Sequence, residues 1–132
     1  MVYCYDMSRE AINRLATQVL GLAIEVHKEL GPGLLESSYE KALSYELSKA
    51  QIPFEAQVRL PIAYKGVKLE SEYIIDIWVN RSIILELKSV ETLLPVHEAQ
   101  LLTYLKLSQT PVGYLINFNT ELLKQGIKRR VI

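Results

Sequence analysis

Two acidic side chains and one lysine lie within apolar segments of this sequence, where uncompensated charge is costly. Asp76 lies in the run Tyr73–Val79, and Glu86 and Lys88 end the hydrophobic run that begins at Ser82. A carboxylate among apolar residues raises the free energy of the folded state unless a cation or a reaction compensates it. The sequence therefore predicts a metal-dependent active site.

The spacing between the two runs predicts how these side chains meet. Only three residues join the runs, a length that suits a β-hairpin. We predict that Val79 pairs with Ile83, which places Asp76 directly opposite Glu86 with Cβ atoms roughly 5 Å apart. Lys88 then follows Glu86 on the same face. A slip of one residue would separate the carboxylates, so the loop length is part of the prediction.

Two close carboxylates repel each other, and a divalent cation removes that conflict. Mg²⁺ or Mn²⁺ prefers oxygen ligands, keeps several waters and binds through one or two carboxylates plus substrate phosphate. Beside such an ion, Lys88 can orient an attacking water or neutralise charge in the transition state. Hydrolysis of a phosphodiester uses all three groups. A buried structural salt bridge between Lys88 and one acid remains the alternative interpretation.

The composition sets outer bounds on this interpretation. The chain has 132 residues, which fits one domain, and 49% of them are hydrophobic, which is enough for a core. Its 15 basic and 15 acidic residues cancel, so no overall positive charge attracts it to nucleic acid. A local basic patch of Lys124 and the run Lys128–Arg130 can still contact phosphates. We favour the interpretation of these residues as a solvated C-terminal tail.

Cysteine content and hydropathy indicate the compartment. Cys4 is the only cysteine, so no internal disulfide forms, and a reducing compartment is expected. No apolar stretch approaches the length that spans a membrane, and the first residues lack the order of a signal peptide. We therefore expect a soluble, cytoplasmic protein without a membrane partner.

The periodicity of apolar residues predicts a single α/β domain. Helical spacing predicts helices over residues 8–30, 36–49 and 95–107. Strands are predicted over residues 54–64, 67–79, 82–90 and 112–118, followed by a short helical or irregular tail from residue 120. Some strands are apolar on both faces, which is typical of a sheet covered on both sides.

The third predicted helix carries a polar stripe. His97, Gln100 and Tyr104 recur at spacings that place them on one helix face. The amide and the phenol can contact a water, a scissile phosphate or Lys88. The alternative interpretation is a polar helix face on which Tyr104 is half-buried. The stripe therefore supports a functional role only if it lies beside Asp76, Glu86 and Lys88.

Two further polar residues allow two interpretations each. Glu36 follows a glycine-rich stop at the start of the second helix, where an anion is stabilised by unsatisfied N–H groups. In the functional alternative, Glu36 is a further ligand of the metal ion, bound directly or through water. His27 lies between apolar residues of the first helix and is more often a hydrogen-bonded structural histidine than a ligand.

The segment from Gly33 to Tyr39 carries a family resemblance. Gly33, Glu36 and Tyr39 match the Gly-x-x-Glu-x-x-Tyr pattern that names the GxxExxY family of small prokaryotic proteins. The resemblance covers nearly the whole chain, since further matching segments follow in order through Glu86-Leu87-Lys88 and Ile116-Asn117-Phe118. The chain thus resembles a branch of the PD-(D/E)xK nuclease superfamily.

This resemblance implies a fold, an activity and a set of roles. The fold would be restriction-endonuclease-like, a three-layer α/β/α arrangement with a mixed central sheet, and the activity would be DNA cleavage with Mg²⁺. Asp76, Glu86 and Lys88 would be the catalytic acid, acid and lysine. Glu36 would be an acid of the first core helix that joins Asp76 and Glu86 at the metal.

The resemblance also bears on the third predicted helix and on activity. Gln100 and Tyr104 resemble the Gln-x-x-x-Tyr motif of the superfamily's recombination-type exonucleases. The chain departs from the pattern at Ile74, where relatives often carry Arg. Two alternatives to a nuclease therefore stay open. One is a non-catalytic module that keeps the fold to bind nucleic acid or protein, and the other is a structural assembly protein whose exposed strand or helix mediates oligomers. For the nuclease itself, a homodimer is the candidate assembly.

Overall fold

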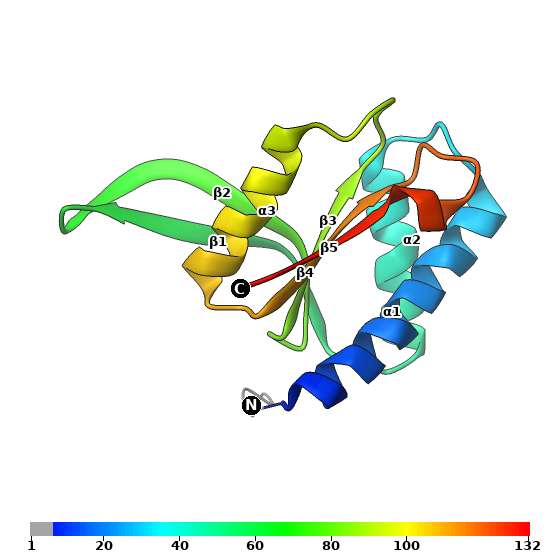
Figure 1. The fold of residues 1–132 in the computed structure, drawn as a ribbon, viewed down its shortest axis with the longest axis horizontal. Helices are drawn as coiled ribbons and strands as arrows, with labels where there is room; N and C mark the ends of the chain where they lie inside the picture. The colour runs from blue at the N-terminus through cyan, green and yellow to red at the C-terminus, as the bar shows by residue number, and fades with distance from the viewer. Residues whose placement is uncertain (1–6) are drawn as a thin grey trace.

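The described chain folds around one mixed β-sheet that lies between helices (Figure 1). The computed structural model describes residues 7–132, apart from the side chains of residues 70–72, so Cys4 lies outside the described residues. The elements follow in the order α1 (Arg9–Leu30), α2 (Glu36–Lys49), β1 (Phe54–Tyr64), β2 (Val67–Val79), β3 (Ile83–Lys88), α3 (Pro95–Ser108), β4 (Val112–Asn117), the 3₁₀ helix η1 (Leu123–Gly126) and β5 (Ile127–Val131).

The sheet has five strands whose spatial order equals their order in the chain. Strands β1, β2 and β3 form an antiparallel meander, and β5 is antiparallel to β4. Strands β3 and β4 are parallel, and α3 makes the crossover between them. The predicted mixed sheet of an α/β domain is confirmed.

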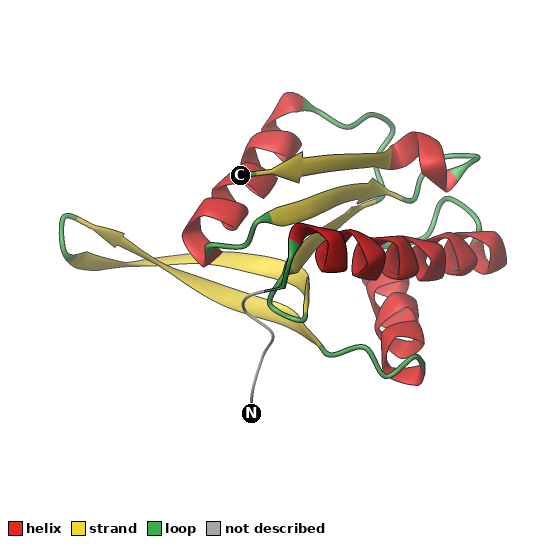
Figure 2. Ribbon diagram, turned by 60° about the horizontal axis from the view of Figure 1, so that its bottom comes forward, coloured by secondary structure: helices red, strands yellow, loops and turns green. Residues whose placement is uncertain are grey.

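Different helices cover the two faces of the sheet (Figure 2). Helices α1 and α2 pack on a face that includes Ile77 and Leu85. Helix α3 packs on the opposite face, against Trp78 and Ile84. Both faces are therefore buried, which explains the strands that are apolar on both sides. The three-layer α/β/α prediction is confirmed.

Local sequence signals set the ends of the helices. The Ser8 hydroxyl accepts a hydrogen bond from the Ala11 N–H at 3.0 Å and caps α1. Gly31 ends α1 with φ of 70°, and Pro95 is the first residue of α3. Helix α2 has the predicted bounds, and α3 runs one residue further than predicted. In the part of the chain that the structure describes, no helix has the length and apolarity to cross a membrane.

The C-terminal region corrects the sequence-based prediction. Residues 127–131, predicted as a solvated tail, form the edge strand β5 beside β4. Arg130 forms an ion pair with Glu98 of α3, and the Arg129 guanidinium donates to the Asn13 Oδ1 at 2.8 Å. The prediction of a tail was wrong because an edge strand carries exposed basic residues, which also characterise a solvated segment.

A tight turn fixes the register of the β2–β3 hairpin. Asn80 and Arg81 both have positive φ, 49° and 54°, as a type I′ turn requires. The Ser82 N–H donates to the Val79 carbonyl at 2.9 Å, and Val79 pairs with Ile83. The predicted register is therefore confirmed.

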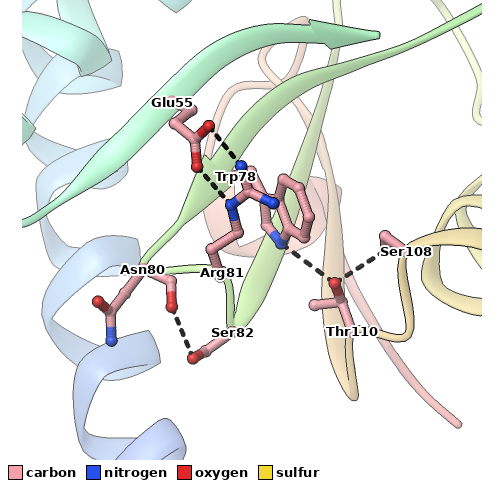
Figure 3. A network of polar contacts seen from close by, with 7 residues as sticks. All are labelled: Glu55, Trp78, Asn80, Arg81, Ser82, Ser108 and Thr110. Atoms are coloured by element: carbon pink, nitrogen blue, oxygen red, sulfur yellow. Dashed lines mark hydrogen bonds and ion pairs between the residues drawn. The ribbon is translucent and has the colours of Figure 1, made fainter. Parts of the chain in front are cut away.

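Side chains around this turn hold it against its neighbours (Figure 3). The Arg81 guanidinium donates to both carboxylate oxygens of Glu55, at 2.6 and 2.8 Å, and lies 4.1 Å from the Trp78 ring centroid. The Trp78 indole N–H donates to the Thr110 hydroxyl at 3.1 Å. We name Glu55, Trp78 and Arg81 the turn clamp, because they tie β1, β2 and the turn together.

Candidate active site

Asp76 and Glu86 meet where the β2–β3 ladder ends. The last paired residues are Ile77 and Leu85, and one further step in the same register sets Asp76 opposite Glu86. There the Leu87 N–H donates at 2.8 Å to Oδ2 of Asp76. A side chain of β2 thus takes a backbone donor of β3, and the two carboxylates lie on neighbouring strands at one point.

Glu86 is a buried carboxylate, and one of its two oxygens has no hydrogen-bond partner among the described residues. Its residue is 3% exposed, and its Oε1 has no hydrogen-bond partner among the described residues. Burial raises the pKa of Glu86 well above its ordinary value, and the negative charge of Asp76 raises it further. A cation at this point would supply the missing partner and the missing charge, so the residues present fit a metal ion.

Lys88 is near this pair and does not neutralise it. Its positive charge lowers the pKa of Glu86, but this effect is smaller than those of burial and Asp76. Within the described part of the chain, Lys88 forms no ion pair. This weighs against the alternative of a structural salt bridge, and it leaves the half-buried ammonium available to a ligand.

One member of the polar stripe of α3, Tyr104, lies near the same carboxylates, and Gln100 is hydrogen-bonded to it. The Gln100 amide donates to the Tyr104 phenol oxygen at 3.0 Å, and Tyr104 is 4% exposed. Burial raises the pKa of Tyr104, as do the nearby charges of Glu86 and Asp76. The alternative in which Tyr104 is half-buried is therefore wrong.

His97, the third member of the stripe, has a local role in the structure. Its Nδ1 accepts a hydrogen bond from the Leu94 N–H at 3.0 Å, which caps the start of α3. His27 is also structural, because its Nε2 lies 2.8 Å from the Thr120 carbonyl oxygen. The preference for a hydrogen-bonded His27 is confirmed.

Glu36 begins α2 at the rim of the site. Its Oε2 accepts a hydrogen bond from the Ser89 N–H at 3.2 Å, directly after Lys88, and the residue lines an open hollow of about 370 Å³. No three His, Cys, Asp or Glu residues among those described form a group that could hold a metal ion. The role of Glu36 as a metal ligand therefore stays a prediction.

The loop before Glu36 explains the Gly-x-x-Glu-x-x-Tyr spacing in physical terms. The Tyr39 phenol donates to the Gly31 carbonyl at 2.6 Å and accepts from the Leu34 N–H at 3.1 Å. Its ring stacks on Phe118, with centroids 4.3 Å apart. Gly33 has φ of 95°, a conformation that favours glycine. The motif tyrosine therefore holds the loop that places Glu36 at the end of β3.

One acidic residue near the site was not predicted. Glu40 lies one helical turn after Glu36, and burial raises its pKa. The Gln57 amide, which donates to Oε1 of Glu40, lowers this pKa, and the charge of Asp76 raises it. The spacing of Glu36 and Glu40 on one helix face was the available signal. Its contact with Gln57 was not predicted, because this contact joins α2 to β1.

Fold and site together define a class. A mixed sheet between helices, with two carboxylates and a lysine on adjacent central strands, is the arrangement that a nuclease of the restriction-endonuclease-like type uses. Residues 13–130 match the family model of the PD-(D/E)XK nuclease superfamily, and the chain belongs to this superfamily. Its nucleases act on nucleic acid and generally use divalent metal ions. No curated protein and no solved structure matches the chain.

Proposed function

We propose that this protein is a nuclease that hydrolyses phosphodiester bonds in DNA with Mg²⁺ or Mn²⁺ at Asp76 and Glu86. One observation carries the proposal: the buried Oε1 of Glu86 has no hydrogen-bond partner among the described residues, and the carboxylate lies beside that of Asp76. In a purely structural role, the pair would have to keep a proton on Glu86, whose pKa is raised, and one buried oxygen would still lack a partner among the described residues.

Asp76 and Glu86 would hold the ion. Two carboxylates suffice, because Mg²⁺ and Mn²⁺ complete their coordination with water and substrate phosphate. When bound, the ion would activate water and stabilise the negative charge that develops on the phosphoryl group. The hydrogen bond from Leu87 N–H fixes one oxygen of Asp76, so this carboxylate is oriented before a ligand arrives.

Lys88 and the α3 pair would act on the substrate. The Lys88 ammonium orients the attacking water or stabilises the charge of the transition state. The Gln100 and Tyr104 side chains are joined by a hydrogen bond, and Tyr104 interacts electrostatically with both carboxylates, so this pair would contact the substrate beside the acidic site. The Gly33, Glu36 and Tyr39 spacing supports a narrower placement in the GxxExxY family, with Glu36 as a further acid of the site.

A cleavage assay tests the proposal. Wild type and the Glu86→Ala/Lys88→Ala variant are incubated with labelled single-stranded, duplex and branched DNA, and with RNA, in Mn²⁺ or Mg²⁺ and then in EDTA. We expect metal-dependent DNA cleavage that falls by roughly 10²–10³-fold in the variant. Glu91→Gln, an exposed acid outside the site, is the matched control and should cut like wild type.

The outcomes separate the candidate functions. Cleavage that continues in EDTA, or at an undiminished rate in the double variant, contradicts the proposed site. Cleavage of RNA alone corrects the substrate. A folded wild type that binds Mn²⁺ and cuts nothing supports the binding module, the candidate that Ile74 in place of the family's Arg favours.

A further inference from the structure

Gln57 interrupts the β1–β2 ladder directly opposite Asp76. Its neighbours Ala56 and Val58 pair with Ile77 and Ile75, so the same register sets Gln57 against Asp76, yet these two are not paired. Gln57 also has φ of 54° in the middle of a strand. A residue with a side chain rarely adopts this conformation, and such exceptions cluster at functional sites.

The unusual backbone goes together with a specific contact. The Gln57 Nε2 donates to Oε1 of Glu40 at 2.5 Å, which ties β1 to α2. Glu40 in turn interacts electrostatically with Asp76. The buried Oε1 of Glu86, which has no partner among the described residues, lies on the next strand. Gln57 therefore lies opposite Asp76 in the register and is hydrogen-bonded to Glu40, so its position links Glu40 to the strand that carries Asp76.

We propose that Gln57 is a positioning residue of the nuclease site, whose amide orients the Glu40 carboxylate next to the strand position that faces Asp76. This inference rests on the proposed function. Among the described residues no three acidic side chains form a group that could hold an ion, so Glu40 would act on a bound ion through water, in keeping with the two-carboxylate site.

The choice of an amide has a physical reason. A glutamine orients a carboxylate with a neutral donor, so the negative charge that attracts a cation is kept. Lysine or arginine at the same place would neutralise Glu40, as Arg81 neutralises Glu55 in the turn clamp. The left-handed backbone of Gln57 accompanies this arrangement, because a regular strand residue would pair with Asp76 instead.

A double-mutant cycle tests the inference. Gln57→Gly accommodates the left-handed backbone and removes the amide, and Glu40→Ala removes the carboxylate. Calorimetric titration of wild type, both single variants and the double variant with Mn²⁺ gives four dissociation constants. We expect each single variant to bind Mn²⁺ about tenfold more weakly. Because Gln57 acts through Glu40, the double variant should bind no more weakly than Glu40→Ala.

Matched variants separate positioning from structure. Gln51→Gly changes another exposed glutamine with positive φ, 59°, outside the site, and should leave the Mn²⁺ affinity unchanged. Gln57→Asn keeps an amide and tolerates the left-handed backbone but is one methylene shorter, so it should bind like Gln57→Gly. If Gln57→Gly does not fold, Gln57→Asn takes its place in the double-mutant cycle.

The result distinguishes this inference from the proposed function. If Asp76→Ala abolishes Mn²⁺ binding but Gln57→Gly does not change it, the site stands and the role of Gln57 is overturned. Additive losses in the double variant overturn it as well, since they show that Gln57 does not act through Glu40. If wild type binds no Mn²⁺, both the site and its positioning residue are overturned.

Discussion

The two ends of the β2–β3 hairpin differ in how their acidic side chains are paired. At the turn, Glu55 receives two hydrogen bonds from Arg81, which also stacks on Trp78. At the other end, Glu86 has an oxygen with no partner among the described residues and lies beside Asp76. The turn clamp compensates its charge within the chain and serves structure. The site instead leaves one carboxylate oxygen without a partner among the described residues, which the proposed cation would supply.

The two ends also depend on each other. The type I′ turn sets the register, and the register places Asp76 opposite Glu86. A slip of one residue would move one carboxylate to the other face of the sheet. The compensated end therefore determines the geometry of the uncompensated end, and variants at each end should have different consequences.

The largest effect is expected at Asp76. Asp76→Asn keeps an oxygen that can accept the Leu87 N–H but removes the negative charge. We expect an unchanged fold by circular dichroism, loss of Mn²⁺ binding by calorimetry, and DNA cleavage lower by roughly 10²–10³-fold. A variant that still binds Mn²⁺ like wild type would show that the Asp76 charge is not what attracts the ion.

The next largest effect is expected at Glu86, and it is an increase in the stability of the metal-free protein. Glu86→Gln removes the buried charge, so the metal-free variant should be more stable than wild type near pH 8, by about 1–3 kcal/mol. Urea unfolding in EDTA measures this difference. Glu55→Gln, which breaks the turn clamp, should instead be less stable than wild type. A stability change of the same sign in Glu86→Gln and Glu55→Gln would contradict the contrast between the two ends of the hairpin.

The pH dependence follows from the raised pKa of Glu86. In the unfolded chain this carboxyl titrates near 4.5, and in the folded protein it titrates well above that value. Between the two values the folded state binds more protons, so the free energy of unfolding falls as pH rises. The advantage of Glu86→Gln should therefore shrink toward pH 5. Added Mn²⁺ should reverse the ranking, because it stabilises only the protein that binds it.

Much of the fold was accessible from the sequence because its signals are local. Apolar periodicity predicted the helices and the first four strands, and the short loop before Ile83 predicted the register of the hairpin. This register brought Asp76 and Glu86 together on paper. Strand β5 was missed because its exposed basic residues, among them Lys128 and Arg129, also characterise a tail.

The rest of the site depends on contacts that sequence patterns do not encode. Gln57 shows this most clearly, because its positive φ and its hydrogen bond to Glu40 arise only when β1 and α2 come together. The spacing of Glu36 and Glu40 placed both acids on one helix face, but it did not show that Glu40 would contact β1. The orphaned oxygen of Glu86 likewise requires the packed structure, since burial cannot be read from one strand.

The smallest effects are expected at Arg81, where two substitutions separate side chain from backbone. Arg81→Ala removes an ion pair whose side chains are 36% and 33% exposed, and a cation–π contact. Such interactions are worth little near the surface, so we expect a loss of about 1 kcal/mol. Arg81→Gly removes the same contacts but relieves the left-handed backbone, a gain of roughly 1 kcal/mol, and the net change should be near zero.

Urea unfolding and Mn²⁺ titration of these two variants complete the comparison between the ends. Both variants should bind Mn²⁺ within about twofold of wild type, because the ladder from Val79↔Ile83 to Ile77↔Leu85 still fixes the register. If Arg81→Ala weakens Mn²⁺ binding and Arg81→Gly does not, strain at the turn is transmitted to the carboxylates. If both weaken it equally, the Arg81 side chain itself supports the site, and the division of the hairpin into a structural end and a functional end fails.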